Sequence, residues 1–137
     1  MAPCLWCISY TQALLTYSTC FQLKKLPGLW SSAEYSSFSV GPEADKYRLN
    51  ITGYSGDAGD ALNSTPGVLR RVNGMQFSTP YQDNDMSGAQ CGKGKAAGWF
   101  RNCGTSTIIR DSNGCWNAWD TTSPKIVTDA RMLVKLD

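Results

Sequence analysis

The stretch KYRLNITGY (Lys46–Tyr54) constrains the fold most, because apolar side chains alternate along it at Tyr47, Leu49 and Ile51. Alternation with a period of two predicts a strand with one apolar face. Two other segments share this pattern, AEYSSFSVG at Ala33–Gly41 and ARMLVKLD at Ala130–Asp137. Together the three segments predict a small antiparallel sheet, with Ala130–Asp137 as its final strand.

The connections between these strands are rich in Gly, Pro, Ser and Asn, which predicts long irregular loops. One of them, SGDAGDAL (Ser55–Leu62), is expected to start a short helix with Ser55 or Asp57 as its N-cap. The predicted class is α+β, with a small antiparallel sheet and much irregular structure. A length of 137 residues and a hydrophobic fraction of 42% fit at most one globular domain.

The composition excludes several functions. The chain contains no histidine, which removes Ser/His/Asp and Cys/His catalysis and every metal site that needs histidine. Its 13 basic and 11 acidic residues are too balanced to indicate a nucleic-acid partner. No stretch approaches the length of about 18 apolar residues that a membrane-spanning helix needs, so no membrane insertion is expected.

Secretion is expected from the cysteines and the glycosylation sequons. The chain has six cysteines, and Asn50 and Asn63 each begin an Asn-x-Thr/Ser sequon, which makes them candidate glycosylation sites. The first twenty residues are a poor signal peptide because polar residues interrupt their apolar run. Residues 1–32 hold three of the cysteines, and we interpret them as an atypical segment that precedes a domain at residues 33–137.

The stretch FSTPYQDNDMSGAQC (Phe77–Cys91) carries the clearest chemistry. A hard cation such as Ca²⁺ takes six to eight oxygen ligands, including carboxylates and backbone carbonyls. The side chains of Asp83 and Asp85 and the carbonyls of Ser87 and Ala89 are candidate ligands. The alternative is a polar surface turn, because Asp-Asn-Asp is good turn chemistry without any metal.

Cys91 and Cys103 flank a Gly-rich stretch directly behind these acids. A disulfide between them would restrain the acidic loop and stabilise the fold by about 3 kcal/mol. Two free thiols are the alternative. The aromatic residues Trp99, Phe100, Trp116 and Trp119 lie close by in the sequence, and core packing is a commoner use for them than stacking on a sugar.

Five segments together resemble the fibrinogen C-terminal (fibrinogen-related) domain family, which includes fibrinogen chains, ficolins, tenascins and angiopoietin-like proteins. The resemblance covers roughly residues 33–137, and the family's first strands and first disulfide have no match in residues 1–32. The chain is thus expected to be a truncated member whose sheet has exposed edges. The matching segments are YRLNITGYSGDAGDAL (Tyr47–Leu62), NGMQFST (Asn73–Thr79) with the DND that begins at Asp83, the segment Cys91–Cys103, GCWNAW (Gly114–Trp119) and ARMLVKL (Ala130–Leu136).

The resemblance implies a fold with a central antiparallel sheet, completed by the last strand, and a loop-rich subdomain that binds calcium and a ligand. It also implies a site. It implies that Asp83, Asp85 and the carbonyls of Ser87 and Ala89 bind Ca²⁺, and that Cys91 pairs with Cys103. It also places a ligand-binding region at Asn102, Cys103, Gly104 and Trp116.

The chain departs from the family pattern near this region. Tyr81 stands where the family has a further acid, and Gly104 replaces a histidine that lines the acetyl-group pocket of ficolin-like members. The pocket residues of those members therefore do not transfer to this chain.

These features predict a secreted, non-enzymatic, calcium-binding recognition module that binds a carbohydrate or acetylated ligand in innate immunity. The alternative is a module that binds a protein receptor in coagulation, matrix or signalling. An enzyme would depend on acids such as Asp57 and Asp60, which lie in a structural turn of the family, and is disfavoured. A last alternative is a chain that does not fold.

Overall fold

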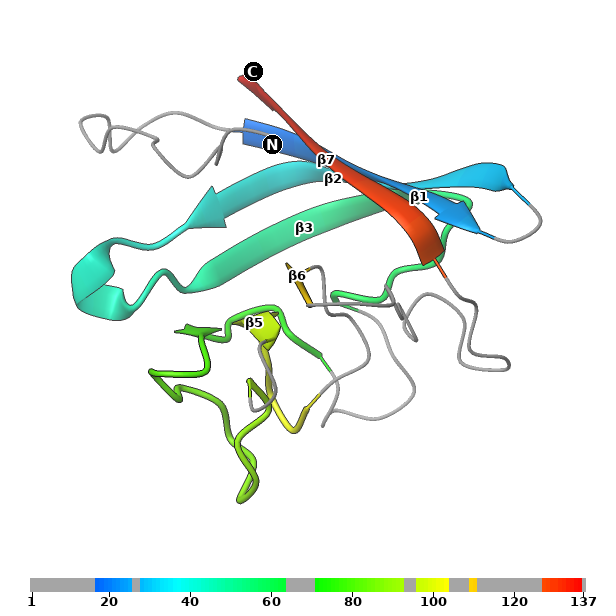
Figure 1. The fold of residues 1–137 in the computed structure, drawn as a ribbon. Helices are drawn as coiled ribbons and strands as arrows, with labels where there is room; N and C mark the ends of the chain where they lie inside the picture. The colour runs from blue at the N-terminus through cyan, green and yellow to red at the C-terminus, as the bar shows by residue number, and fades with distance from the viewer. Residues whose placement is uncertain are drawn as a thin grey trace.

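A computed structural model describes residues 17–25, 28–63, 71–92, 96–103, 109–110 and 127–136. Four strands in these ranges form the main sheet: β1 (Tyr17–Lys25), β2 (Leu29–Val40), β3 (Leu49–Gly56) and β7 (Val127–Leu136). Their order is β3-β2-β1-β7 and every pair is antiparallel (Figure 1). The three strands predicted from alternation are confirmed as β2, β3 and β7.

A second, smaller sheet lies beside the main one. It has the order β4-β5-β6 and consists of β4 (Phe77–Ser78), β5 (Ala96–Trp99) and β6 (Ile109–Arg110). The only helix in the described ranges is a single 3-10 turn, η1 (Glu43–Asp45). The described part of the chain is thus mostly antiparallel sheet and loop, and the α+β class is not confirmed.

The helix expected at Ser55–Leu62 is wrong. β3 continues to Gly56, and bends and turns follow it as far as Asn63. Gly56 and Gly59 have φ angles of +116° and +92°, far from those of a right-handed helix. The two glycines instead turn the chain away from the end of the strand.

The boundary expected between residues 32 and 33 is also wrong, because it falls inside β2. β1 lies within the supposedly separate segment and pairs with both β2 and β7. Phe21 and Leu23 on β1 are buried in the core, with Gln22 between them on the other face. This short alternation is a strand signal that the cysteines and aromatics of the segment obscured.

The core lies between one face of the main sheet and the loops that cover it. The main sheet supplies Phe21, Leu23, Ala33, Tyr35, Phe38, Leu49 and Ile51, the loops supply Ala58, Ala61, Leu62, Val72 and Met75, and β5 supplies Trp99. The smaller sheet is therefore fixed to the main sheet through a shared apolar layer, to which Trp99 and Phe77 belong.

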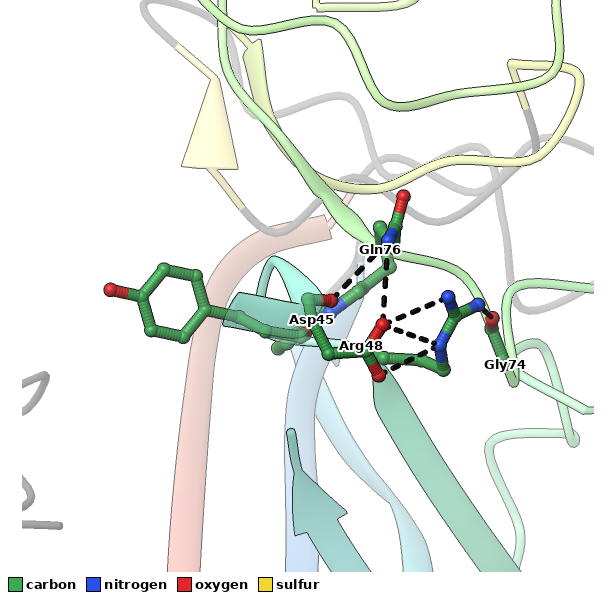
Figure 2. Close-up of polar contacts among 6 residues, drawn as sticks. Asp45, Arg48, Gly74 and Gln76 are labelled. Carbon is green, nitrogen blue, oxygen red and sulfur yellow. Dashed lines mark hydrogen bonds and ion pairs between the residues drawn. The ribbon is translucent and has the colours of Figure 1, made fainter. Parts of the chain in front are cut away.

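Polar contacts around η1 also connect the main sheet to the loops that cover it (Figure 2). Arg48 donates from Nε to Oδ2 of Asp45 at 3.0 Å and from Nη1 to the carbonyl of Gly74 at 2.7 Å. The hydrogen bonds from Arg48 hold the pKa of Asp45 below its usual value. Nearby, the indole of Trp99 donates to the carbonyl of Tyr47 at 2.8 Å. The turn after η1 thus connects the main sheet to the loop at residues 71–76 and to β5.

Candidate cation site

Asp85 organises the acidic loop from within. Its Oδ1 accepts a hydrogen bond from the backbone N–H of Ser87, and its Oδ2 accepts one from the N–H of Cys91, both at 2.8 Å. One carboxylate thereby holds the loop in a curl that brings residues 85 to 91 around it.

Asp83 and Asn84 have different surroundings. Asp83 is exposed, and its Oδ1 accepts from the N–H of Asp85 at 3.1 Å. Asn84 faces β4, where its Nδ2 donates to the carbonyl of Phe77 at 2.6 Å and its N–H donates to Oγ of Ser78 at 3.0 Å. Asn84 therefore anchors the loop to the smaller sheet and leaves the carboxylates on either side of it for other partners.

Three further contacts close the loop. Gln90 donates to the carbonyl of Pro80 at 2.9 Å, and the N–H of Met86 donates to the carbonyl of Arg101 at 2.7 Å. Cys91 and Cys103 form a disulfide with their Cα atoms 4.9 Å apart. The structure therefore contains the expected pair, and the bond ties the end of the loop to the segment after β5.

The disulfide also lies next to a proposed ligand. Both of its sulfur atoms are 3.8 Å from the carbonyl oxygen of Ala89.

The sequence did not reveal Gln90 and Arg101 as residues that close the loop. Nothing local marks them, because their partners lie ten or more residues away.

The donor set fits a hard cation. Asp83 and Asp85 supply two carboxylates that retain free lone pairs, and the carbonyls of Ser87 and Ala89 are oxygens of the kind that Ca²⁺ accepts. Oδ1 of Asn84 is buried without a hydrogen-bond partner, so the loop carries one more unsatisfied oxygen. Within the described ranges, no three His, Cys, Asp or Glu residues gather at one point, so water would have to complete the coordination shell.

The chain matches a known family over most of its length. The family model for the C-terminal globular domain of fibrinogen beta and gamma chains covers residues 8–127. The chain belongs to this fibrinogen family. Because the match begins at residue 8, it includes β1 and corrects the expectation that residues 1–32 have no counterpart in the family.

Two curated relatives illustrate the family. The human fibrinogen gamma chain is 39% identical over 100 residues, which are 67% of this chain and 22% of the relative. Angiopoietin-4 from Bos taurus is 33% identical over 132 residues, which are 88% of this chain and 25% of the relative. The chain thus spans a quarter or less of the length of these relatives.

Solved structures show the same fold. The fibrinogen-like globe domain of human ANGPTL6 has a TM-score of 0.71 and 25% identity, covering 88% of this chain and 56% of that one. A lamprey fibrin D-dimer in complex with the peptide ligand Gly-His-Arg-Pro-amide has a TM-score of 0.72 and 23% identity, covering 88% of this chain and 45% of that one. The second likeness carries the fold alone. The chain is a fibrinogen-like globe built mostly of antiparallel sheet.

Only two of the predicted ligand-binding residues of this fibrinogen-type chain lie within the described ranges. Asn102 and Cys103 are exposed, and Gly104 and Trp116 lie outside the described residues. Trp99 and Phe100 are buried, and the ring of Trp99 meets that of Phe77 edge-on with centroids 5.1 Å apart. Core packing, the favoured interpretation of the aromatic cluster, is therefore confirmed for these two residues.

The two glycosylation candidates also differ. Asn50 is exposed on β3, whereas Asn63 is half-buried and its Oδ1 accepts from Nδ2 of Asn73 at 3.3 Å. A glycan attaches to the amide nitrogen of asparagine, and the greater exposure of its side chain makes Asn50 the more accessible sequon. The only free thiol in the described ranges is that of Cys20, and burial followed by the charge of Glu34 raises its pKa.

Proposed function

We propose that this chain is an extracellular, non-enzymatic recognition module of the fibrinogen type, which binds a protein partner and holds Ca²⁺ in the loop Asp83–Cys91. The observation that carries the proposal is the build of this loop. Asp85, Gln90 and the Cys91–Cys103 disulfide fix its backbone and leave carboxylate oxygens available at its surface. A loop restrained in this way orders fewer groups when it binds a cation or a partner.

A protein partner is better supported than a carbohydrate. The relatives reported above are a fibrinogen chain and an angiopoietin, and the lamprey structure carries a peptide ligand. The glycan interpretation depended on the ficolin-like pocket, and this chain has Gly104 where those members have histidine. We therefore place the protein-binding alternative ahead of the carbohydrate interpretation.

The acids that an enzyme would need are engaged in structural hydrogen bonds. Asp57 accepts from the N–H of Ser32 at 2.7 Å, and Asp60 accepts from the hydroxyl of Tyr35 at 2.8 Å. General acid–base catalysis requires a group that can reach a substrate proton. These two carboxylates instead secure the turn that follows β3, which supports a non-enzymatic role.

Calcium at the loop would act through charge and rigidity. A bound divalent cation offsets the repulsion between Asp83 and Asp85 and lowers the freedom of the segment between them. The N–H of Met86 donates a hydrogen bond to the carbonyl of Arg101, and the stiffening of the loop therefore extends to the neighbouring exposed residue Asn102. The surface around residues 101–103 is thus the proposed contact region for a partner.

Affinity chromatography tests this function. The whole chain is passed in calcium buffer over immobilised Gly-His-Arg-Pro-amide and, separately, over immobilised N-acetylglucosamine. We expect retention on the peptide, release by EDTA, and weaker retention of Asp83→Asn. Glu43→Gln is the matched control, because it removes one acid from η1, away from the loop.

The two columns separate the two ligand classes. Retention on N-acetylglucosamine alone would restore the carbohydrate interpretation. Calcium-independent retention, or retention on neither matrix, would contradict the proposal.

A further inference from the structure

The Cys91–Cys103 disulfide contacts the candidate cation site directly. Its two sulfur atoms each lie 3.8 Å from the carbonyl oxygen of Ala89, and the N–H of Cys91 donates to Oδ2 of Asp85 at 2.8 Å. Asp85 and Ala89 are two of the four residues that would supply oxygens to Ca²⁺. A change in the bond between the two sulfur atoms therefore changes the surroundings of two of these oxygens.

The two halves of the loop are fixed by different contacts. The N–H of Met86 donates to the carbonyl of Arg101 at 2.7 Å, which holds the residues next to Asp85 without the help of the cysteines. The stretch from Ser87 to Cys91 comes after this contact, and the disulfide ties its end to the segment after β5. Loss of the disulfide thus loosens the carbonyl ligands of the second half and leaves the first half in place.

The backbone at Cys103 is strained. Its φ angle is +55°, in the left-handed region that residues other than glycine seldom adopt. Such a conformation persists where the surrounding structure holds it, and the disulfide is a covalent restraint at this residue. Cleavage of the bond lets the backbone of Cys103 relax, which favours the open dithiol form.

We propose that the Cys91–Cys103 bond is a thiol–disulfide exchange site that a dithiol reductant opens, and that its redox state sets the calcium affinity of the loop Asp83–Cys91. One thiolate of the reductant attacks a sulfur atom of the bond and forms a mixed disulfide, and the other cysteine leaves as a thiolate. The second thiolate of the reductant then displaces the remaining cysteine. The two cysteines take up the two protons that the reductant gave up, two electrons pass to the protein, and the reductant ends as a disulfide.

The exchange adds a control to the proposed cation site and rests on that site. Intact, the disulfide orders the carbonyls of Ser87 and Ala89 in advance, so the oxidised chain orders fewer groups when it binds Ca²⁺. By linkage, Ca²⁺ then stabilises the oxidised form against the reductant by the same factor. Because the two forms are compared at equilibrium, this factor does not depend on which sulfur atom the reductant reaches first.

Reduction should release the loop without unfolding the main sheet. The loop is anchored to β4 through Asn84, whose Nδ2 donates to the carbonyl of Phe77 at 2.6 Å. The ring of Phe77 contacts that of Trp99, which belongs to the buried core. Among the described residues, neither Cys91 nor Cys103 is part of that core. The dithiol form therefore keeps the sheets and the first half of the loop, and reoxidation can restore the second half.

Two measurements on the whole chain test the coupling. The chain is equilibrated in mixtures of reduced and oxidised dithiothreitol, in saturating calcium or in EDTA at matched ionic strength. It is then alkylated, and the peptides that carry Cys91 and Cys103 are quantified by mass spectrometry. We expect calcium to raise by about tenfold the ratio of reduced to oxidised dithiothreitol at which half of the bond is open.

Titration calorimetry supplies the second factor. The fully reduced chain should bind calcium about tenfold more weakly than the oxidised chain, and linkage requires this factor to equal the redox shift. The loss should be partial, because a hydrogen bond from Gln90 to the carbonyl of Pro80, at 2.9 Å, still holds the end of the loop. Two factors that disagree would contradict the coupling.

Two variants serve as controls. Asp83→Asn removes a calcium ligand and keeps both cysteines, so calcium should no longer shift the redox midpoint. Cys20→Ser removes a free thiol on β1, outside the loop, and should leave both factors unchanged. A shift that survives in Asp83→Asn would overturn the proposal, because the shift would then not arise from the cation site.

Hydrogen exchange on the wild-type chain shows whether the release is local. On reduction, the amides of Ser87 and Cys91, which donate to Asp85, should exchange faster. The amide of Leu49, which donates to the carbonyl of Met75 at 3.0 Å, should keep its protection. Loss of protection at Leu49 would show general unfolding and would overturn a local switch.

The calorimetric outcomes also separate this inference from the proposed function. An oxidised chain that binds no calcium would remove the cation site, and the inference with it. Equal calcium affinities of the oxidised and reduced chains would overturn the inference and leave the cation site in place.

Discussion

The hydroxyl of Tyr35, on the buried face of β2, donates a hydrogen bond to Oδ1 of Asp60 at 2.8 Å. The tyrosine side chain is only 1% exposed, and its ring contacts those of Phe21 and Tyr54. Asp60 belongs to the glycine- and acid-rich turn that follows β3, so this one bond joins the centre of the core to the first loop that covers it. The acid in the turn is therefore a structural acceptor.

Replacing Tyr35 with Phe should destabilise the protein by about 1.5 to 3 kcal/mol, the range for a lost hydrogen bond to a charged group. Asp60 keeps its second bond, from the N–H of Asn63 at 3.1 Å, so the carboxylate is not left without a partner. Urea unfolding measures the change. Tyr81→Phe is the matched control, because Tyr81 is 98% exposed and its loss of a hydroxyl should change the free energy of unfolding by less than about 0.5 kcal/mol.

The same bond predicts a loss of stability at alkaline pH. Burial, reinforced by Asp60, raises the pKa of Tyr35 well above its ordinary value of 10.0. Below pH 10 the Tyr35 hydroxyl keeps its proton in both the folded and the unfolded chain, and its hydrogen bond to Asp60 stabilises the fold fully. Above it the unfolded chain loses the proton first, so the stabilisation declines as the pH rises. The wild-type advantage over Tyr35→Phe should thus stay constant up to about pH 10 and shrink as the pH rises to about 11, and an equal difference at pH 8 and pH 11 would contradict the assignment.

Gly56 ends β3 in a conformation that only glycine adopts easily. Its φ is +116°, and a Cβ atom there would collide with the backbone carbonyl oxygen of Ser32 on β2. Gly56→Ala should cost more than about 1 kcal/mol through backbone strain, with the collision added to it. Gly88→Ala is the control, because a Cβ atom at Gly88 would have no neighbouring atom within 4 Å, and its midpoint in urea should stay close to that of the wild type. Equal losses for the two variants would argue against the observed end of β3.

The strands of the main sheet were easier to predict from the sequence than the turn after β3. Alternation predicted β2, β3 and β7, because each presents one face to the core and the other to solvent. The helix at Ser55–Leu62 failed because helix propensity ignores the tertiary hydrogen bonds of Asp57 and Asp60, which hold that segment in a turn. β1 was missed because the cysteines and aromatics of residues 1–32 obscured its short alternation at Phe21 and Leu23, and half of its pairing is with β7, more than a hundred positions away.

The candidate site was predictable in composition but not in structure. The residue types identified Asp83, Asp85 and the two cysteines. They did not show that Asp85 binds two backbone N–H groups while Asp83 stays exposed, because that difference arises from how the chain curls after residue 85. The closure of the loop by Gln90 and by the carbonyl of Arg101 was equally invisible, since any glutamine or carbonyl can form such a bond.

Breaking the disulfide should weaken both the fold and the loop. Cys91 and Cys103 are 12 residues apart, and removing a cross-link over a loop of this size costs about 3 kcal/mol in the chain-entropy model. The double change Cys91→Ser with Cys103→Ser should lower the urea midpoint and also reduce calcium affinity, because residues 85 to 91 lose their fixed end. An unchanged midpoint would show that the bond constrains little.

The two acids of the loop should respond differently to calcium. Asp83→Asn keeps an oxygen for the N–H of Asp85 but loses a charged ligand, so its stability in EDTA should match the wild type while the heat of calcium binding in titration calorimetry falls sharply. Asp85→Asn should lose that heat and also about 1 to 2 kcal/mol of stability in EDTA, because an amide has one acceptor oxygen for the two N–H groups of Ser87 and Cys91. Glu43→Gln should retain both the heat and the stability. Heats for Asp83→Asn equal to those of the wild type would remove the cation site, and an undiminished stability of Asp85→Asn in EDTA would contradict its role as the organiser of the loop.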